Sequence, residues 1–144
     1  MTACILDASV AAKWFLPGDD ETLVEEAFRL LADYAEGGVR FLVPDLFWLE
    51  MANILWKAAR TKRITRSCAE ESLFALESRE IPTAPTLPLI SEALAIAATF
   101  DRPVYDSVYV ALAVSSGLPL LTADERLMNA LGAKFPIRWL GSIQ

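Results

Sequence analysis

Two acidic residues stand just after short apolar runs that have the composition of β-strands. Asp7 follows the run ACIL at 3–6, and Asp124 comes two residues after the run LPLLT at 118–122. Parallel strands end at one edge of a sheet, so both carboxylates are expected at the edge where α/β proteins bind ligands. A carboxylate removed from water must be protonated, paired with a base or bound to a metal ion.

Two further acids lie on apolar faces of expected helices. Glu50 stands in the segment PDLFWLEMANILW, where the residues three and four positions away include Phe47 and Ile54. Asp106 begins an apolar stripe that continues through Tyr109, in a segment with no other charge. Both carboxylates therefore point toward the interior or toward a site at its edge.

The basic residues near these acids in sequence, such as Arg102 before Asp106, are too few to pair with all four. A divalent cation would offset several carboxylates at once. Each acid also has a structural alternative: Asp124 as a helix N-cap, Asp106 at a helix N-terminus, and Asp7 in a strand-end turn with Ser9. Taken together, the four positions favour a metal site.

The chain contains no histidine, which excludes several classes of enzyme. Ser-His-Asp and Cys-His catalysis and HExxH zinc sites all require that side chain. The two cysteines, Cys4 and Cys68, do not have the spacing of a zinc site and are expected to be reduced residues of a cytoplasmic protein. Metal-activated water needs no imidazole, so metal-dependent hydrolysis stays open.

The 144 residues alternate between strand-like and helix-like segments. Apolar periodicity, caps and Gly or Pro breaks predict strands at 3–6, 41–43, 118–122 and 137–140, with an edge strand or loop at 80–88. They predict helices at 11–15, 20–36, 45–60, 65–78, 89–100, 105–115 and 125–131, with Ser9 as a cap of the first. This order indicates one α/β domain over 1–144 around a mainly parallel sheet.

Overall charge argues against binding nucleic acid through the whole surface. Thirteen basic and nineteen acidic residues give a net charge of −6. A local basic cluster nevertheless lies at the end of the helix expected at 45–60 and in the turn after it, where it could contact RNA phosphates or simply suit a helix C-terminus. Its members are Lys57, Arg60, Lys62, Arg63 and Arg66. Lys13, beyond Asp7, could also contact a phosphate or extend from an apolar helix to water. No apolar stretch is long enough to span a membrane.

The sequence resembles a PIN domain, and more narrowly a VapC-type toxin of toxin–antitoxin pairs. The resemblance spans nearly the whole chain and rests on four segments in order: ILDASVAAKWFLP at 5–17, PDLFWLEMANILWKA at 44–58, VYDSVYVALA at 104–113 and LLTADERL at 120–127. It implies a three-layer α/β/α sandwich with about five short strands. The family's acidic quartet falls on Asp7, Glu50, Asp106 and Asp124, and its hydroxyl positions fall on Ser9 and Thr122.

The resemblance also implies Mg²⁺- or Mn²⁺-dependent hydrolysis of RNA phosphodiester bonds. Asp7 and Asp106 are then expected as direct metal ligands, with Glu50 and Asp124 acting through water, through a second ion or on the nucleophile. Ser9 and Thr122 are expected to support the carboxylates. The implied partners are an RNA substrate, a second copy of the chain, and a VapB-type antitoxin that binds a groove near the helices expected at 20–36 and 45–60.

Two other functions fit parts of the pattern. A phosphatase or phosphotransfer domain also places acids after its first strand, but Asp7-Ala8-Ser9 is not a DxD motif and Lys134 follows a helix rather than a strand. A non-catalytic interaction module would use the acids as caps and its apolar surface for a partner. Stabilisation by Mn²⁺ distinguishes a metal site from such a module.

Overall fold

A computed structural model describes residues 1–18 and 21–143, which form a parallel sheet surrounded by helices. The strands are β1 (Ala3–Leu6), β2 (Arg40–Pro44), β3 (Thr83–Ala84), β4 (Leu120–Thr122) and β5 (Ile137–Trp139). The helices are α1 (Ala8–Ala11), α2 (Val24–Ala35), α3 (Leu46–Arg60), α4 (Arg66–Glu77), α5 (Ile90–Phe100), α6 (Val104–Ser116) and α7 (Glu125–Leu131). Short 3₁₀ turns cover Ala12–Trp14, Leu87–Leu89 and Leu140–Ser142.

The order of the strands determines where ligands can bind. The sheet runs β3-β2-β1-β4-β5, and every neighbouring pair is parallel. From β1 the chain builds the sheet outward on one side through β2 and β3, and then on the other side through β4 and β5. The direction reverses between β1 and β4, so a crevice is expected beyond the carboxyl ends of these two strands.

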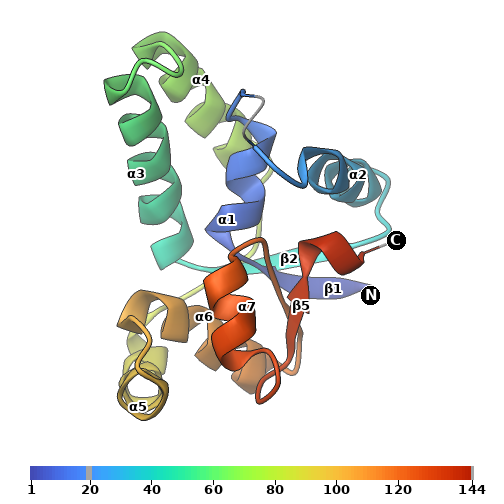
Figure 1. The fold of residues 1–144 in the computed structure, drawn as a ribbon. Coiled ribbons are helices and arrows are strands. Elements are labelled where there is room, and N and C mark those ends of the chain that lie inside the picture. The colour runs from blue at the N-terminus through green and yellow to red at the C-terminus, as the bar shows by residue number, and fades with distance from the viewer. Residues whose placement is uncertain (19–20, 144) are drawn as a thin grey trace.

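Helices cover both faces of this sheet (Figure 1). Helices α1 to α4 lie on one side, with α3 and α4 forming an antiparallel pair, whereas α5 and α6 lie on the other side. Helix α6 packs against β1, β2 and β4. The predicted α/β/α sandwich with a parallel five-stranded sheet is therefore confirmed.

The position of helix α6 in the core explains why its sequence is almost free of charged residues. All of its residues from Ser107 to Ala113 are buried, because it lies across the middle of the sheet. The buried side chains of β1 and β4, among them Ile5 and Leu121, meet this helix in the core. A helix buried nearly all round needs an apolar sequence all round, and this one has it.

The first predicted helix is wrong in its limits. Helix α1 begins at Ala8, so Ser9 lies in its first turn and does not cap it. The physical reason is that the Ser9 hydroxyl is occupied by Asp7 and by the backbone N–H of Ala123. By contrast, Thr65 caps α4 by accepting a hydrogen bond from the Cys68 N–H.

Other boundaries differ by a few residues. The start predicted for the second helix, Asp20, lies outside the described residues, and α2 begins at Val24 after Leu23, which has a left-handed backbone (φ 59°). The segment 80–88 contributes the two-residue edge strand β3, which pairs with β2 alone. Among residues 1–18 and 21–143, no helix has the length and apolar character needed to cross a membrane.

Candidate active site

Asp7 lies at the point where the sheet changes direction. Its backbone N–H donates to Leu121 O at 3.1 Å, which continues the pairing of Leu6 with Leu121 one residue past the end of β1. The carboxylate is thereby fixed beside the end of β4. Its side chain is nearly inaccessible, since the residue is only 8% exposed.

Two hydroxyl groups hold the Asp7 carboxylate. Ser9 Oγ and Thr122 Oγ1 each donate a 2.7 Å hydrogen bond to Asp7 Oδ2. The hydroxyls are themselves anchored, because Ser9 Oγ accepts from the Ala123 N–H and Thr122 Oγ1 accepts from the Asp124 N–H, both at 3.0 Å. Both predicted supporting residues thus contact the acid they were expected to orient.

Burial dominates the electrostatics of Asp7. It raises the pKa of this carboxyl to about 6, although the hydrogen bonds from Thr122 and Ser9 act in the opposite direction. The negative charges of Asp106 and Asp124 raise this pKa further. Three of the four predicted acids therefore lie within one shared electrostatic field.

Glu50 brings the fourth carboxylate to the same place from α3. Its Oε1 is buried and has no hydrogen-bond partner in the described part of the chain. Burial raises the pKa of Glu50 to about 7, and the charges of Asp7 and Asp106 add to this effect. The Oε1 atom is therefore open to a cation or to a further hydrogen-bond donor.

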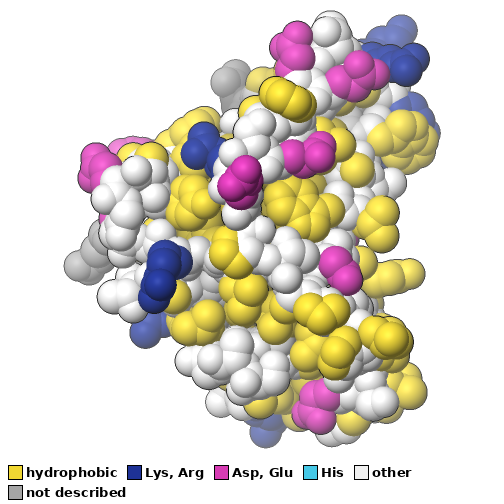
Figure 2. Space-filling view, turned by 180° about the vertical axis from the view of Figure 1, so that it is seen from behind, with side chains coloured by type: hydrophobic (Ala, Val, Ile, Leu, Met, Phe, Trp, Pro, Cys, Tyr) yellow, Lys and Arg dark blue, Asp and Glu magenta, His cyan; other side chains and the backbone are white. Residues whose placement is uncertain are grey.

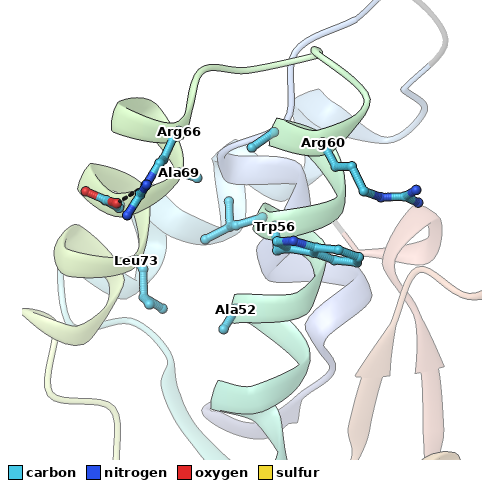
Figure 3. Close-up of a pocket in the computed structure, with 9 residues that line it drawn as sticks. Ala52, Trp56, Arg60, Arg66, Ala69 and Leu73 are labelled. Atoms are coloured by element: carbon cyan, nitrogen blue, oxygen red, sulfur yellow. Dashed lines mark hydrogen bonds and ion pairs between the residues drawn. The ribbon is translucent and has the colours of Figure 1, made fainter.

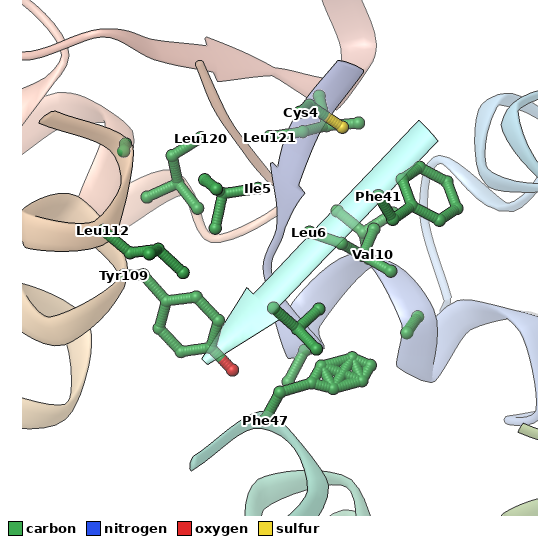
Figure 4. Close-up of a cluster of buried hydrophobic side chains, with 14 of the residues drawn as sticks. Cys4, Ile5, Leu6, Val10, Phe41, Phe47, Tyr109, Leu112, Leu120 and Leu121 are labelled. Atoms are coloured by element: carbon green, nitrogen blue, oxygen red, sulfur yellow. The ribbon is translucent and has the colours of Figure 1, made fainter. Parts of the chain in front are cut away.

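Tyr109 is a member of this group that the sequence analysis placed only in the core. The residue is 2% exposed, and its hydroxyl also lacks a hydrogen-bond partner within the described residues. In Figure 4 its ring packs among aliphatic side chains, and the hydroxyl points away from Ile5 and Leu120. The hydroxyl nevertheless lies near the Glu50 carboxylate and lowers its pKa as a hydrogen-bond donor, so the two groups are in contact at a geometry looser than that of a close hydrogen bond. Tyr109 lies three residues after Asp106, about one helical turn, and this spacing could have indicated that both side chains lie on the same face of the helix.

Asp106 and Asp124 are engaged by neighbours of their own. Asp106 Oδ2 accepts a 3.0 Å hydrogen bond from Arg102 Nη2, and burial is the main cause that raises the pKa of Asp106. Asp124 caps α7 through Oδ1, which accepts from the N–H groups of Arg126 and Leu127. The structural role considered for Asp124 is thus confirmed, and it leaves Oδ2 of that carboxylate outside the cap.

The donor set suits a hard divalent cation, although the ligands are not gathered around one point. Over residues 1–18 and 21–143, no three acidic or cysteine side chains converge closely enough to form a metal-ligand group. The four acids supply only oxygen atoms, which Mg²⁺ and Mn²⁺ prefer. The unpartnered Glu50 Oε1 is an acceptor that a cation or its bound water would satisfy. The residues present therefore fit such an ion.

The predicted RNA-binding residues do not form one free basic surface. The buried Lys13 pairs with Glu21 at 3.3 Å, and Arg63 contacts the same carboxylate at 3.1 Å. Arg60 stacks on the Trp56 ring at 5.0 Å. Lys57 and Lys62 are exposed, the latter with a left-handed backbone. Glu21 thus links two segments that the sequence analysis treated separately.

The chain matches a known protein family over most of its length. The model of the PIN domain family matches residues 4–132. The chain belongs to the PIN domain family. The resemblance to VapC-type toxins is also confirmed, because this PIN domain is 32% identical over 134 residues to Ribonuclease VapC3 of Pyrobaculum aerophilum. The aligned residues cover 92% of this chain and 94% of the relative.

Two solved structures share the fold of this PIN domain. PAE2754 from Pyrobaculum aerophilum superposes with a TM-score of 0.69 at 23% identity, over 98% of this chain and 91% of that one. A toxin–antitoxin complex from Klebsiella pneumoniae gives a TM-score of 0.66 at 13% identity, over 97% of this chain and 99% of that one. At these identities the likeness establishes the fold alone.

Proposed function

We propose that this PIN domain is an endoribonuclease that uses Mg²⁺ or Mn²⁺ and acts in the cytoplasm as the toxin of a toxin–antitoxin pair. The observation that carries the proposal is the buried Glu50 Oε1, which makes no close hydrogen bond within the described residues, although Tyr109 lies near this carboxylate, and which lies in the field of Asp7 and Asp106. Similarity to a VapC ribonuclease over 92% of the chain supports the substrate class. Structural acids would be paired or capped throughout, whereas this group is incomplete.

The acidic and hydroxyl residues of the site have different proposed roles. Asp7 and Asp106 are the proposed ligands of the metal ion, and Glu50 and Asp124 bind through water, hold a second ion or orient the attacking water. When bound, the ion supplies an activated water and neutralises charge on the scissile phosphate. Ser9 and Thr122 keep the Asp7 carboxylate in one orientation through Oδ2. Oδ1 of Asp7 makes no hydrogen bond to the described residues and stays free to act as a ligand.

Cleavage of cellular RNA tests this proposal. The purified chain is expected to cut RNA in Mg²⁺ or Mn²⁺ and not in EDTA, and Asp7→Asn should abolish cutting. Asp33→Asn is the matched control, because Asp33 is exposed on α2 and its charge loss is the same. A folded Asp7→Asn variant that cuts as well as the parent chain contradicts the proposal, and inactivity in every metal favours an interaction module.

An apolar groove between α3 and α4 is the proposed site of a VapB-type antitoxin. It has a volume of about 600 Å³, and its lining residues are Ala52, Leu55, Trp56, Ala59, Arg60, Arg66, Ala69, Glu70 and Leu73. Figure 3 shows Trp56 and Arg60 projecting from α3, with Arg66 and Leu73 on α4. The groove lies one helix further along the chain than expected from the family. Its small floor residues suit the apolar face of an amphipathic segment, and Arg60, which has no ion pair within the described residues, suits an acidic residue at the edge of that segment.

A second copy of the chain is the proposed partner of another exposed apolar surface. Leu87, Leu94 and Tyr105 are 80%, 59% and 65% exposed, and they lie just before α5, on α5 and on α6. Figure 2 shows exposed hydrophobic side chains along the side of the molecule formed by α3 and α5. Apolar exposure of this kind marks protein interfaces. Light scattering of the purified chain and of Leu94→Glu tests the homodimer.

A further inference from the structure

The ion pair between Arg102 and Asp106 joins a proposed ligand of the metal ion to a cation of the chain itself. Arg102 lies in the short turn between α5 and α6, after Asp101, whose left-handed backbone (φ 55°) ends α5. Arg102 Nη2 approaches Asp106 Oδ2 to 3.0 Å, and the two side chains are 19% and 24% exposed. Of the four acids, only Asp106 has an ion pair within the described residues.

The pairing leaves the guanidinium incompletely satisfied. Only one N–H···O bond joins the two groups, whereas an arginine and a carboxylate can form two in parallel. Arg102 Nε is buried and lacks an acceptor in the described part of the chain. A buried donor without an acceptor opposes the contact that buries it. The guanidinium is therefore held less firmly at Asp106 than its short distance suggests.

We propose that Arg102 is a positioning residue, the internal counter-ion of Asp106 in the metal-free protein, and that a divalent cation exchanges with its guanidinium. This inference rests on the proposed function, in which Asp106 is a metal ligand. In this role, Arg102 controls how readily the Asp106 carboxylate becomes available to the metal ion.

Charge and position favour the exchange. The guanidinium carries one charge and reaches one acid, whereas a divalent ion interacts with Asp106 together with Asp7 and Asp124, whose charges already act on the same group. Arg102 lies outside both helices and is partly exposed, so its long side chain can turn to solvent without disturbing α5 or α6.

Metal affinity measures the competition directly. Titration calorimetry with Mn²⁺ is expected to give Arg102→Gln a dissociation constant about 3- to 10-fold lower than that of the parent chain, because the competing cation is removed. Arg29→Gln is the matched control, because Arg29 pairs with Glu25 at the same spacing of four residues on α2. The Arg29→Gln and Arg102→Gln variants have the same net charge. The affinity of Arg29→Gln for Mn²⁺ should equal that of the parent chain.

Release of the Arg102 guanidinium from Asp106 can be observed separately by NMR. In ¹⁵N spectra, the Nε–H signal of Arg102, assigned by its loss in Arg102→Gln or Arg102→Lys, should change in parallel with Mg²⁺ binding and gain fast exchange with water. The titration itself uses the parent chain, and either of the two variants is enough for the assignment, so it does not depend on how well Arg102→Gln folds. It separates exchange from a general change of charge.

Three outcomes decide between the two proposals. Tighter Mn²⁺ binding by Arg102→Gln together with an Nε–H signal that responds to Mg²⁺ supports the exchange. Metal binding with an unchanged Nε–H signal, or with equal affinities for both variants, overturns the exchange and leaves the proposed nuclease intact. A parent chain that binds neither ion overturns both.

Discussion

Thr122 donates a 2.7 Å hydrogen bond to Asp7 and so joins the ends of two neighbouring strands that are 115 residues apart in sequence. The same hydroxyl oxygen accepts the N–H of Asp124 at 3.0 Å. Thr122 is fully buried. One side chain thus sets the orientation of Asp7 and the start of the loop that carries Asp124.

Replacement of Thr122 by valine should weaken both the fold and the site. The change keeps the shape but leaves Asp7 with one hydroxyl donor and the Asp124 N–H without its acceptor, so a loss of roughly 1–3 kcal/mol in the free energy of unfolding is expected. Because the hydrogen bond from Thr122 lowers the pKa of Asp7, that pKa should rise further above 6. Urea denaturation and cleavage assays measure the two effects.

Thr122→Ser is the matched control, since it keeps the hydroxyl and removes a methyl group. It should retain the pKa of Asp7 and most of the activity. Equal stability and activity in the valine and serine variants would show that the hydroxyl does not orient Asp7.

The sequence predicted the order of the elements because each strand is a compact apolar run with a clear break. It also predicted which acids follow the strands and which lie on the inward faces of the helices. It predicted that Ser9 supports Asp7 but not that the same hydroxyl accepts the Ala123 N–H, because that partner is supplied by a segment 114 residues away. Pairings such as those of Lys13 and Arg63 with Glu21 likewise depend on where loops meet.

Removal of the Tyr109 hydroxyl should cost little stability. Within the described residues the buried hydroxyl makes no close hydrogen bond, so Tyr109→Phe removes only its weaker contact with Glu50 and should change the free energy of unfolding by less than about 1 kcal/mol. The pKa of Glu50, which this hydroxyl lowers, should rise above 7. Carboxyl titration by ¹³C NMR reports the pKa.

A double-mutant cycle supplies the control for Tyr109. Tyr109→Phe is expected to act on metal binding only through the pKa of Glu50, so in Glu50→Gln the same change should not alter metal binding. A loss of more than about 2 kcal/mol in Tyr109→Phe alone would show that the hydroxyl is hydrogen-bonded in solution.

The metal-free protein should lose stability as the pH rises from about 4 to 7. Asp7 and Glu50 have folded pKa values near 6 and 7, above their ordinary values of 3.8 and 4.5. A raised folded pKa means that the folded state holds the proton more tightly, so stability falls once the unfolded chain ionises and levels off above the folded pKa. Each group contributes on the order of 3 kcal/mol.

Melting temperatures across this pH range, with and without Mg²⁺, measure the effect. The cation favours the ionised acids and should offset the decline, so that metal stabilisation grows with pH up to about 7. Glu50→Gln should flatten the metal-free decline above pH 4.5, while Glu36→Gln, an exposed control just after α2, should not. Stability that rises through this window would contradict the assigned pKa directions.

A carboxylate placed in the groove between α3 and α4 should prevent antitoxin binding. Leu73 lines the groove from α4 and faces a partner of the kind proposed, whose apolar side chains would meet the new charge. When the chain is co-expressed with its cognate antitoxin, Leu73→Asp should reduce co-purification at least tenfold, as a buried unpaired charge commonly does at interfaces. The neighbouring Phe74 is 73% exposed and is not part of the groove lining, so Phe74→Ser should co-purify as the parent chain does. Equal recovery of both variants would place the antitoxin on another surface, with circular dichroism confirming that each is folded.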